Sequence, residues 1–352
     1  MSDVSFGGRS DWIDIRNYQT PSVNGVQDDT QAFATAAYMA NGKAIQLSPG
    51  TYYVQNIQLI SGLVIRGSGR NATTIVHTGS GKAISNNTGT SIGNIELADF
   101  TLICNPHSTI GIEFSMVYQS IASRINILQS NGGNTNFTGV SFDHGDTGTS
   151  YYNTMTDVSV NAGSTNTIGT GYLFQNKANS NRLIGCRTNA VTTAVQIAKS
   201  TTDHIVVIGC TFEQFTNGII DNGYRNVFVG NRFENSGSAS GTGIILSSTT
   251  TNALMAGNQY INLTTAFTNG NMSGANMIMD HSQLNAKYIS HDSGGGWNSV
   301  MNMRNYGIQS AGYLGLSTFP SSRAPSNSIF VNSADNKLYF KDSAGVLTAL
   351  TL

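Results

Sequence analysis

Charged residues, cysteine and proline are all scarce in this 352-residue chain. Asp, Glu, Lys and Arg together make up 11% of the residues, and the net charge is −1 without any basic run. A surface for nucleic acid needs clustered Lys and Arg, so nucleic-acid binding is not predicted. The three cysteines cannot form a disulfide framework, and neither cysteine nor histidine has the spacing of a metal site. We therefore expect no metal and no cofactor.

Long apolar runs are missing as well. No segment approaches the roughly 20 apolar residues that a membrane-spanning helix needs, so we expect no insertion into a membrane. Residues 1–8, MSDVSFGG, contain no apolar signal region. From this we expect a protein that is made in a host cytoplasm and reaches the outside by lysis or on a particle.

Glycine is abundant, with 39 residues, and Asn, Ser and Thr occur throughout. Turn-forming and β-branched residues favour many short strands over helices. The hydrophobic content of 39% is sufficient for a continuous core. The composition therefore predicts an all-β protein. One helix is expected after Asp28-Asp29-Thr30, in the alanine-rich segment that ends at Ala40.

One short motif occurs four times between about residues 180 and 270. Its glycines, Gly185, Gly209, Gly230 and Gly257, follow one another at steps of 24, 21 and 27 residues. A repeat of this length, with alternating apolar residues and no helical period, is typical of a β-solenoid.

The alternation also predicts which side chains of the repeat point inward, because successive side chains of a strand lie on opposite faces. We expect one inward column of aromatic rings and one of cysteine followed by asparagine, whose amides hydrogen-bond as a ladder. These columns contain Phe212, Phe233 and Tyr260, and Cys186, Cys210, Asn231 and Asn258, respectively.

Three motifs between residues 20 and 80 resemble those of a known superfamily. Residues 24–33, NGVQDDTQAF, resemble the D-G-x-x-D-D-T-x-A-[IF] opening of the pectate-lyase-like superfamily, with Asn24 in place of the usual acidic residue. Residues 45–52 are similar to its V-x-L-P-x-G-x-Y motif, and residues 66–75 to its R-G-x-G-x-x-x-T-x-I motif. The resemblance implies a right-handed, single-stranded parallel β-helix with an N-terminal capping helix. Many superfamily members of this form are bacteriophage tailspikes and capsule depolymerases.

The C-terminal sequence has a different residue pattern from the repeats. Residues 325–341 resemble a P-S-N-S-[LI]-[FY]-V-[DN]-x-x-D-x-K-L-Y-[FW]-[KR] tail of phage tail fibres and spikes. A hairpin is predicted around Asp335-Asn336, with a further strand over 345–350. A single hairpin is marginally stable, so we expect oligomerisation, most plausibly as a homotrimer. The predicted domains are an attachment or cap segment at 1–20, a parallel β-helix at 21–270 and a C-terminal β oligomerisation region at 271–352.

The first catalytic candidate is a pair of glutamates, Glu213 and Glu234. The repeat places both outward in one column on adjacent coils, about 5 Å apart, which is near the carboxylate separation of retaining glycosidases. Arg187 and Arg232 share the neighbouring outward column as candidate substrate-binding residues. The alternative is a solvated Glu/Arg ladder that connects successive coils.

A second candidate is the acidic loop with Asp143, His144 and Asp146, which has Tyr151 and Tyr152 close by in sequence. An acid, a base and aromatic rings could form a glycan site, and a polar turn between two strands explains the same residues equally well.

A third candidate is the loop from Asp221 to Arg225, which contains Tyr224 and which we expect to lie beside the glutamate pair. Asp99 and Asp157 are further outward acids for which the sequence shows no evident partner.

These observations together predict a phage tailspike or tail-fibre receptor-binding protein, located in the virion tail with other tail proteins. Its expected ligand is a bacterial surface polysaccharide, either capsule or lipopolysaccharide O-antigen, with degradation by endoglycosidase activity as an open question. The alternatives are a non-catalytic structural or adhesion component of the tail and a secreted polysaccharide lyase.

Overall fold

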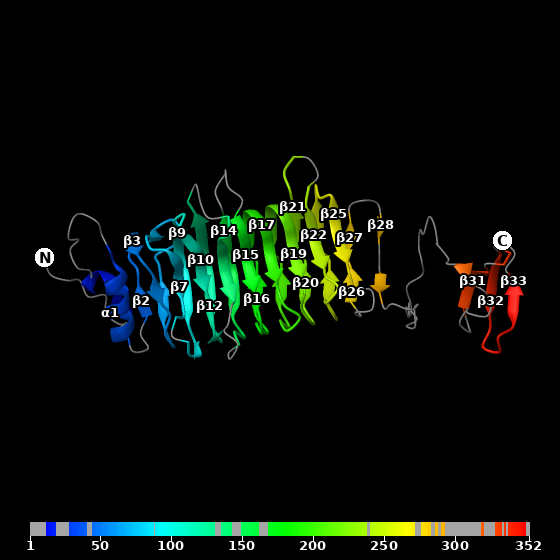
Figure 1. The fold of residues 1–352 in the computed structure, drawn as a ribbon, viewed down its shortest axis with the longest axis horizontal. Helices are drawn as coiled ribbons and strands as arrows, with labels where there is room; N and C mark the ends of the chain where they lie inside the picture. Colours follow the sequence, from blue (N-terminus) through cyan, green and yellow to red (C-terminus); the bar gives the residue numbers. More distant parts are fainter. Residues whose placement is uncertain are drawn as a thin grey trace. The chain divides into compact units, whose positions relative to one another are not determined.

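Short strands dominate the chain, and most of them pair in parallel with the strands one coil earlier and one coil later. The computed structural model describes residues 12–18, 28–40, 44–87, 89–130, 135–142, 149–161, 168–237, 240–271, 276–282, 286–287, 290–292, 318–319, 328–332, 334–335 and 337–349. The chain forms two compact units, residues 1–297 and 298–352. Figure 1 shows the coils of the first unit stacked one on another, beginning at helix α1 (Thr30–Ala40).

Three parallel sheets run along the first unit, and long strands contribute to two of them by bending at a corner. Sheet 1 contains β1 (Trp12–Asp14), β2 (Ala44–Gln46), β5 (Val64–Arg66), the first parts of β9 (Glu96–Cys104), β12 (Ile121–Gln129) and β14 (Thr154–Asn161), then β16 (Arg182–Ile184), β18 (Val206–Ile208), β20 (Val227–Val229), β23 (Leu254–Ala256) and β26 (Asn276–Met279).

Sheet 2 follows sheet 1 within each coil. It contains β3 (Gly50–Val54), β6 (Thr73–His77), the second parts of β9, β12 and β14, the first parts of β17 (Arg187–Ile197) and β19 (Thr211–Asp221), then β21 (Arg232–Glu234) and β24 (Gln259–Ile261).

Sheet 3 closes each coil. It contains β4 (Ile57–Gln58), β7 (Gly81–Ser85), β10 (Ser108–Glu113), β13 (Thr138–Phe142), β15 (Ile168–Phe174), the second parts of β17 and β19, then β22 (Thr242–Leu246) and β25 (Thr265–Asn269). The minor elements of this unit are the 3-10 helix Ile15–Tyr18, the parallel pair β8 (Ile92–Gly93) and β11 (Val117–Tyr118), and the antiparallel strands β27 (His281–Ser282), β28 (Ala286–Lys287) and β29 (Ser290–Asp292).

Aromatic rings stack along the core, as the repeat predicts. Phe212, Phe233 and Tyr260 are buried in consecutive coils, with ring centroids 5.2 Å and 5.4 Å apart. A second stack at the end of sheet 3 places the rings of Phe142 and Phe174 4.5 Å apart and nearly parallel. Such stacks add ring–ring attraction to the burial of apolar area.

The corner between sheets 1 and 2 explains the repeated glycines. Gly185, Gly209, Gly230 and Gly257 all have φ between 60° and 64°, the left-handed region that glycine adopts without steric cost. The residue that follows each glycine points inward. In this column Asn231 Nδ2 donates to Asn258 Oδ1 at 3.0 Å, and Asn258 Nδ2 donates to Asp280 Oδ2 at 2.7 Å. The predicted asparagine ladder is confirmed.

Helix α1 covers the first coil with one face. Ala32, Phe33, Ala36 and Ala40 are buried, and the ring of Phe33 meets Tyr52 edge to face at 6.2 Å. Asp28 stabilises the N-terminus of the helix, because its Oδ1 accepts a hydrogen bond from Thr30 N at 2.9 Å. No helix in the described part of the chain is long and apolar enough to cross a membrane.

The second unit contains one small sheet. Strand β30 (Thr318–Phe319) pairs in parallel with β31 (Ser328–Asn332), and β31, β32 (Leu338–Lys341) and β33 (Leu347–Ala349) form an antiparallel meander. The predicted fold class, a parallel β-helix with an N-terminal helix and a small C-terminal β region, is confirmed.

Candidate functional site

A polar ridge runs along the corner between sheets 3 and 1. Six residues, one per coil, form a continuous series of parallel bridges. In all six coils the next residue has a left-handed backbone conformation, and four of these next residues are counted with the ridge. We call these ten residues the corner ridge: Tyr118, Tyr151, Asn179, Asp203, Tyr224 and Thr251, with Tyr152, Ser180, His204 and Arg225.

Aromatic rings form the first part of the corner ridge. The rings of Tyr118 and Tyr151 stack at 5.4 Å and 12°, and Tyr152 meets Tyr151 edge to face at 5.3 Å. Tyr152 is 57% exposed and has a φ of 59°, which is uncommon for a residue with a large side chain. Its amide donates to Asn179 O in the next coil at 3.3 Å, so the ladder maintains this conformation.

Charged groups form the second part of the corner ridge, where Asp203 is the central residue. Its carboxylate accepts hydrogen bonds from the guanidinium of Arg225, including Nε at 3.1 Å, and lies 2.9 Å from His204 Nδ1. The guanidinium carbon of Arg225 is 4.3 Å from the ring centroid of Tyr224, within cation–π range. Three coil steps of about 4.8 Å separate Tyr151 from Tyr224, so the ridge spans roughly 14 Å between them.

The structure therefore brings together Tyr151, Tyr152, Tyr224 and Arg225, which the sequence placed in two different candidate sites. Sequence reasoning missed Tyr118, Asp203 and His204, because the ridge residues share no residue type.

The glutamate pair lies elsewhere, on the outer side of sheet 2. Glu213 and Glu234 are in register on adjacent strands, with their side chains 42% and 30% exposed. Arg232 contacts both: its Nη1 is 3.6 Å from Glu213 Oε1, and its Nη2 pairs with Glu234 Oε2. One guanidinium therefore contacts both carboxylates, which remain partly exposed. Arg187 belongs to the same outward column as Arg232, with Thr211 between them.

The glutamate pair and the Tyr224 loop do not form one site. Glu213 is in the part of β19 that belongs to sheet 2, whereas Tyr224 follows the part of β19 that belongs to sheet 3. The segment from Phe215 to Asp221 crosses sheet 3 between them. The remaining predicted site residues, Asp143, His144 and Asp146, lie outside the described residues.

Asp99 and Asp157, for which the sequence showed no partner, both pair with arginines. Arg124 donates to Asp99 through Nε at 2.6 Å and Nη2 at 2.7 Å, and these hydrogen bonds lower the pKa of Asp99. Arg70, from a distant turn, pairs with Asp157. The Arg124–Asp99 pair joins adjacent coils and the Arg70–Asp157 pair spans three coil steps, both at the corner between sheets 1 and 2, so both acids have a structural explanation.

Asp221, the first residue of the third candidate loop, is a buried carboxyl. It lies in register with Ile197 and Leu246, in an otherwise apolar column, and has no exposed surface. Its Oδ1 accepts from Gly223 N and Asn226 Nδ2, both at 2.8 Å, while Oδ2 has no hydrogen-bond partner. Burial raises the pKa of Asp221 to about 6. The two hydrogen bonds shape the turn that carries Tyr224 and Arg225.

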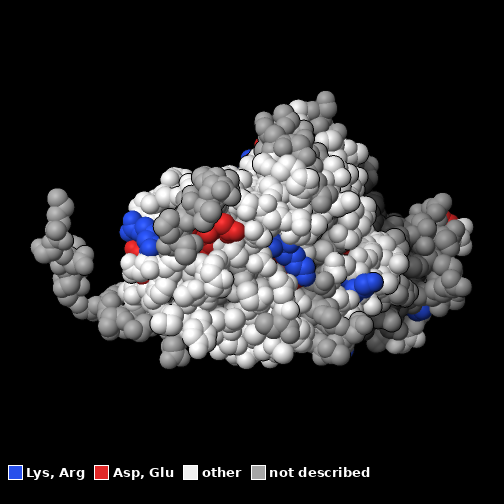
Figure 2. Space-filling model, turned by 60° about the vertical axis from the view of Figure 1, so that its left-hand side comes forward, with Lys and Arg blue, Asp and Glu red and all other residues white. Residues whose placement is uncertain are grey.

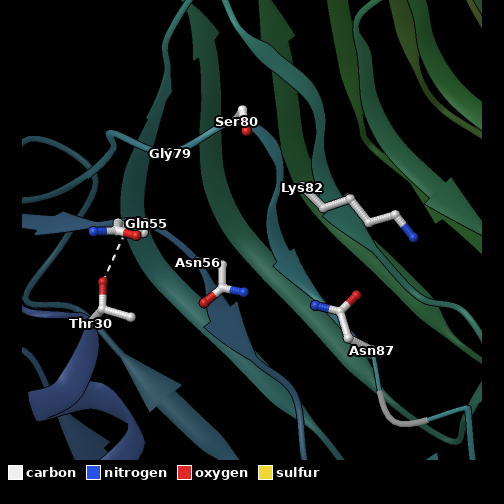
Figure 3. A pocket seen from close by; sticks show the side chains of 7 residues that line it. All are labelled: Thr30, Gln55, Asn56, Gly79, Ser80, Lys82 and Asn87. Atoms are coloured by element: carbon white, nitrogen blue, oxygen red, sulfur yellow. Dashed lines mark hydrogen bonds between the residues drawn. The ribbon is translucent and has the colours of Figure 1, made fainter.

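A cavity of about 350 Å³ lies beside the start of α1 (Figure 3). Gln55 N donates to Thr30 Oγ1 at 2.8 Å at its edge, and Lys82 Nζ donates to the buried Glu113 at 2.6 Å. Its lining offers amides and hydroxyls but no aromatic ring, from Thr30, Gln55, Asn56, Gly79, Ser80, Lys82 and Asn87. It is thus a less suitable sugar site than the corner ridge.

Charge is as sparse on the surface as in the composition. On the face drawn in Figure 2, acidic and basic side chains form small separate groups among uncharged residues. Within the described residues, no group of three or more His, Cys, Asp and Glu is arranged to hold a metal ion.

No model of a known protein family and no curated protein matches the chain. Among solved structures, it is similar to ORF18 of Geobacillus virus E2, with 16% identity, a TM-score of 0.42 and coverage of 97% of this chain and 86% of that one. It is also similar to tailspike protein 2 of Escherichia coli O157:H7 bacteriophage CAB120 (16% identity, TM-score 0.44, 76% and 39% coverage).

A third similar structure is gp49, the tailspike of Acinetobacter baumannii bacteriophage Fri1, described as a capsular polysaccharide depolymerase (9% identity, TM-score 0.48, 75% and 58% coverage). At these identities the likeness concerns the fold. The resemblance to the pectate-lyase-like superfamily implied a parallel β-helix, and the strand pairing of the chain itself has this architecture.

Proposed function

We propose that this chain is a receptor-binding protein of the phage tailspike or tail-fibre type, which binds a bacterial surface polysaccharide as a homotrimer. The observation that carries the proposal is the corner ridge, where the exposed ring of Tyr152, half-buried tyrosine rings and hydrogen-bonding side chains follow one another on successive coils. A linear polysaccharide likewise repeats apolar ring faces and hydroxyl groups along its length.

Each part of the corner ridge has a role in this proposal. The ring of Tyr152 packs against the apolar face of a sugar, the amide of Asn179 donates to and accepts from its hydroxyls, and the carboxylate of Asp203 accepts hydrogen bonds from them. Little net charge is required, in agreement with the composition. The resemblance of residues 325–341 to the tails of phage fibres and spikes supports a place in the virion tail, beside other tail proteins.

The test uses the purified full chain and a panel of capsular and O-antigen polysaccharides from bacterial strains. We expect at least one polysaccharide to bind, and Tyr152→Ala to weaken its Kd about tenfold, equivalent to about 1.4 kcal/mol. The matched control is Tyr38→Ala, since Tyr38 is 83% exposed on α1 and not part of the ridge. Absence of binding across the panel, or equal affinity of Tyr152→Ala and wild type, would contradict the proposal.

A second candidate function is endoglycosidase activity, which the in-register pair Glu213 and Glu234 favours. It requires Arg232 to release at least one carboxylate when a substrate binds. New reducing ends should then appear on the bound polysaccharide and be lost in Glu213→Gln and Glu234→Gln. If the polysaccharide binds but remains intact, the protein is an adhesin without this activity.

A further inference from the structure

The corner between sheets 2 and 3 is interrupted at one coil, where strands β19, β21 and β22 follow one another (Figure 1). Three residues connect the two sheets in the coil of β19, 214–216, and three in the coil of β24, 262–264. Between β21 and β22 the connection has seven residues, 235–241. Insertions in single coils of a solenoid often lie on its binding face.

A recess of about 250 Å³ lies beside this longer connection. Pockets for drug-sized molecules measure about 300–1,000 Å³, so the recess has room for about one sugar residue. All of its lining residues are uncharged. We call it the corner recess, and its lining includes Gln214, Phe215, Thr216, Asn235, Ser236 and Ser240.

The side chain of Asn235 connects two walls of the corner recess. This residue is buried, its Oδ1 accepts from Phe215 N at 2.9 Å, and its Nδ2 donates to Phe215 O at 2.9 Å. The same Nδ2 also donates to Ser240 O at 2.6 Å. The recess is therefore preformed, and a ligand does not have to order these two walls when it binds.

The exposed groups of the corner recess suit hydroxyl-rich ligands. Gln214 is exposed, and its Nε2 donates to Ser236 Oγ at 3.4 Å, a long hydrogen bond that a ligand hydroxyl can replace. Thr216 and Ser240 are exposed as well. Amides and hydroxyls both donate and accept hydrogen bonds, as the hydroxyls of a sugar require.

The neighbouring charges favour an uncharged ligand. Glu213 and Glu234 directly precede Gln214 and Asn235 on the sheet 2 side of the recess, and both contact Arg232. Two carboxylates with one shared guanidinium leave an excess negative charge. A sugar that carries a carboxylate would be repelled there.

We propose that the corner recess binds one uncharged sugar residue, at a second saccharide site separate from the corner ridge. Sheet 3 lies between the two sites, because the ridge follows this sheet and the recess precedes it. The inference rests on the proposed function for the source of the sugar, a bacterial surface polysaccharide. It also gives the glutamate pair of the second candidate function a neighbouring saccharide site.

The first experiment measures binding of free sugars to the purified full chain by saturation-transfer NMR. The probes are glucose, galactose, mannose, rhamnose, N-acetylglucosamine and N-acetylgalactosamine, with glucuronate and galacturonate as charged counterparts. We expect at least one uncharged sugar to bind more tightly than both uronates, and Ser236→Trp, which fills the recess from an exposed position, to weaken its Kd at least tenfold. Binding of no uncharged sugar, tighter binding of a uronate, or an unchanged Kd in Ser236→Trp would overturn the inference.

A second pair of variants covers the case in which Ser236→Trp does not fold. Gln214 has a φ of 51°, which glycine adopts without strain, so Gln214→Gly removes the amide and should not destabilise the corner. The matched control is Gln119→Gly, since Gln119 is also exposed, has a φ of 50° and lies outside the recess. We expect Gln214→Gly to weaken the Kd of the bound sugar about fivefold and the control to leave it unchanged. Equal effects of both substitutions would overturn the inference.

Tyr152→Ala distinguishes the two saccharide sites. We expect this ridge variant to keep the wild-type Kd for the free sugar while its affinity for the polysaccharide falls. Loss of the free sugar in Tyr152→Ala but not in Ser236→Trp would overturn the inference and leave the proposed function intact. Binding of the sugar in the recess of a chain that binds no polysaccharide would contradict the proposed function and support the recess.

Discussion

Glu213 and Glu234 stand in register on adjacent strands of sheet 2, and a single guanidinium, that of Arg232, contacts both carboxylates. The arrangement combines a repulsive pair with a shared counter-charge. Loss of the arginine would leave two carboxylates that repel each other, whereas loss of the arginine from an isolated ion pair leaves one carboxylate without such repulsion.

Replacement of Arg232 by Met should leave the two carboxylates facing each other across about one coil step. Because all three side chains are partly exposed, we expect a loss below about 1 kcal/mol, which decreases at high salt. Urea denaturation at low and high ionic strength measures it. Adding Glu213→Gln to this variant should recover most of the loss; an equal loss in the double variant would contradict the repulsion.

Asn258 is expected to be far more important for stability than its size suggests. It accepts from Asn231 N, donates to Phe228 O at 2.9 Å and to Asp280 Oδ2, and is fully buried. Asn258→Ala leaves several buried groups unpaired at about 1–3 kcal/mol each, so we expect a loss of about 3 kcal/mol or more. The control is Asn56→Ala at an exposed position, which should change stability by less than about 0.5 kcal/mol.

Asp221 should make the protein less stable as the pH rises from about 4 to above 6. Its folded-state pKa of about 6 lies above the ordinary aspartate pKa of 3.8, so the folded state binds the proton more tightly. The resulting stabilisation is complete below about pH 3.8 and lost as the pH rises through 6, a difference of about 3 kcal/mol.

The measurement compares urea denaturation of wild type and Asp221→Asn at pH 4.5 and pH 7.5. The variant should lack the part of the pH dependence that is due to Asp221. Burial lowers the pKa of His77, which has the opposite effect on stability, but His77 is present in both proteins and cancels. If the free energy of unfolding had the same pH dependence in both proteins, ionisation of Asp221 would not destabilise the folded state.

Asp203→Asn should weaken polysaccharide binding at the corner ridge while changing the stability of the protein little. The pairs of Asp203 with Arg225 and His204 lie at the surface, so their loss should cost less than about 1 kcal/mol. Polysaccharide affinity should fall about tenfold, because the carboxylate both orients Arg225 and accepts hydroxyl hydrogen bonds. Titration calorimetry with the bound polysaccharide checks this, and unchanged affinity would exclude Asp203 from the site.

The three cysteines should not react in the native protein. All are buried, and burial raises the pKa of the Cys104 thiol to about 12. A thiol reagent should modify none of them natively and all three in denaturant. Rapid modification of any of them in the folded chain would indicate that the core around it opens.

The fold could be predicted because the sequence pattern that specifies it recurs in each coil. Gly209 and Gly230 recur at the same corner, and the alternation around Phe212 and Phe233 fixes which side chains enter the core. The same register placed Glu213 beside Glu234, as the structure has them.

The corner ridge could not be predicted, because the position of Asp203 depends on the lengths of the turns before it. Its neighbours in the column are Asn179 and Tyr224, which share neither charge nor shape with it. The burial of Asp221 was missed for a related reason: an acidic residue at the end of a strand indicates a turn, whereas the structure buries it between Ile197 and Leu246.

The outward apolar residues of β18, β20 and β23 left a signal in the sequence. Val206–Ile208, Val227–Val229 and Leu254–Ala256 are apolar at every position, so the alternation that marks a strand with one solvated face is absent there.

The asparagine ladder of the core has a direction. Asn231 donates to Asn258, and Asn258 donates to Asp280, toward the C-terminal end of the β-helix, while each side-chain amide also donates to a carbonyl of the preceding coil, Val207 O and Phe228 O. A further asparagine at the last position would have an N–H group left without an acceptor. Asp280 has only acceptors, and its two oxygens receive the Asn258 N–H, the Asn258 amide and the hydroxyl of Tyr260 at 2.6 Å. The carboxylate of Asp280 therefore ends the ladder of hydrogen bonds. To extend the ladder by one coil, Asp280 would be replaced by an amide and the acid would be placed one coil onward.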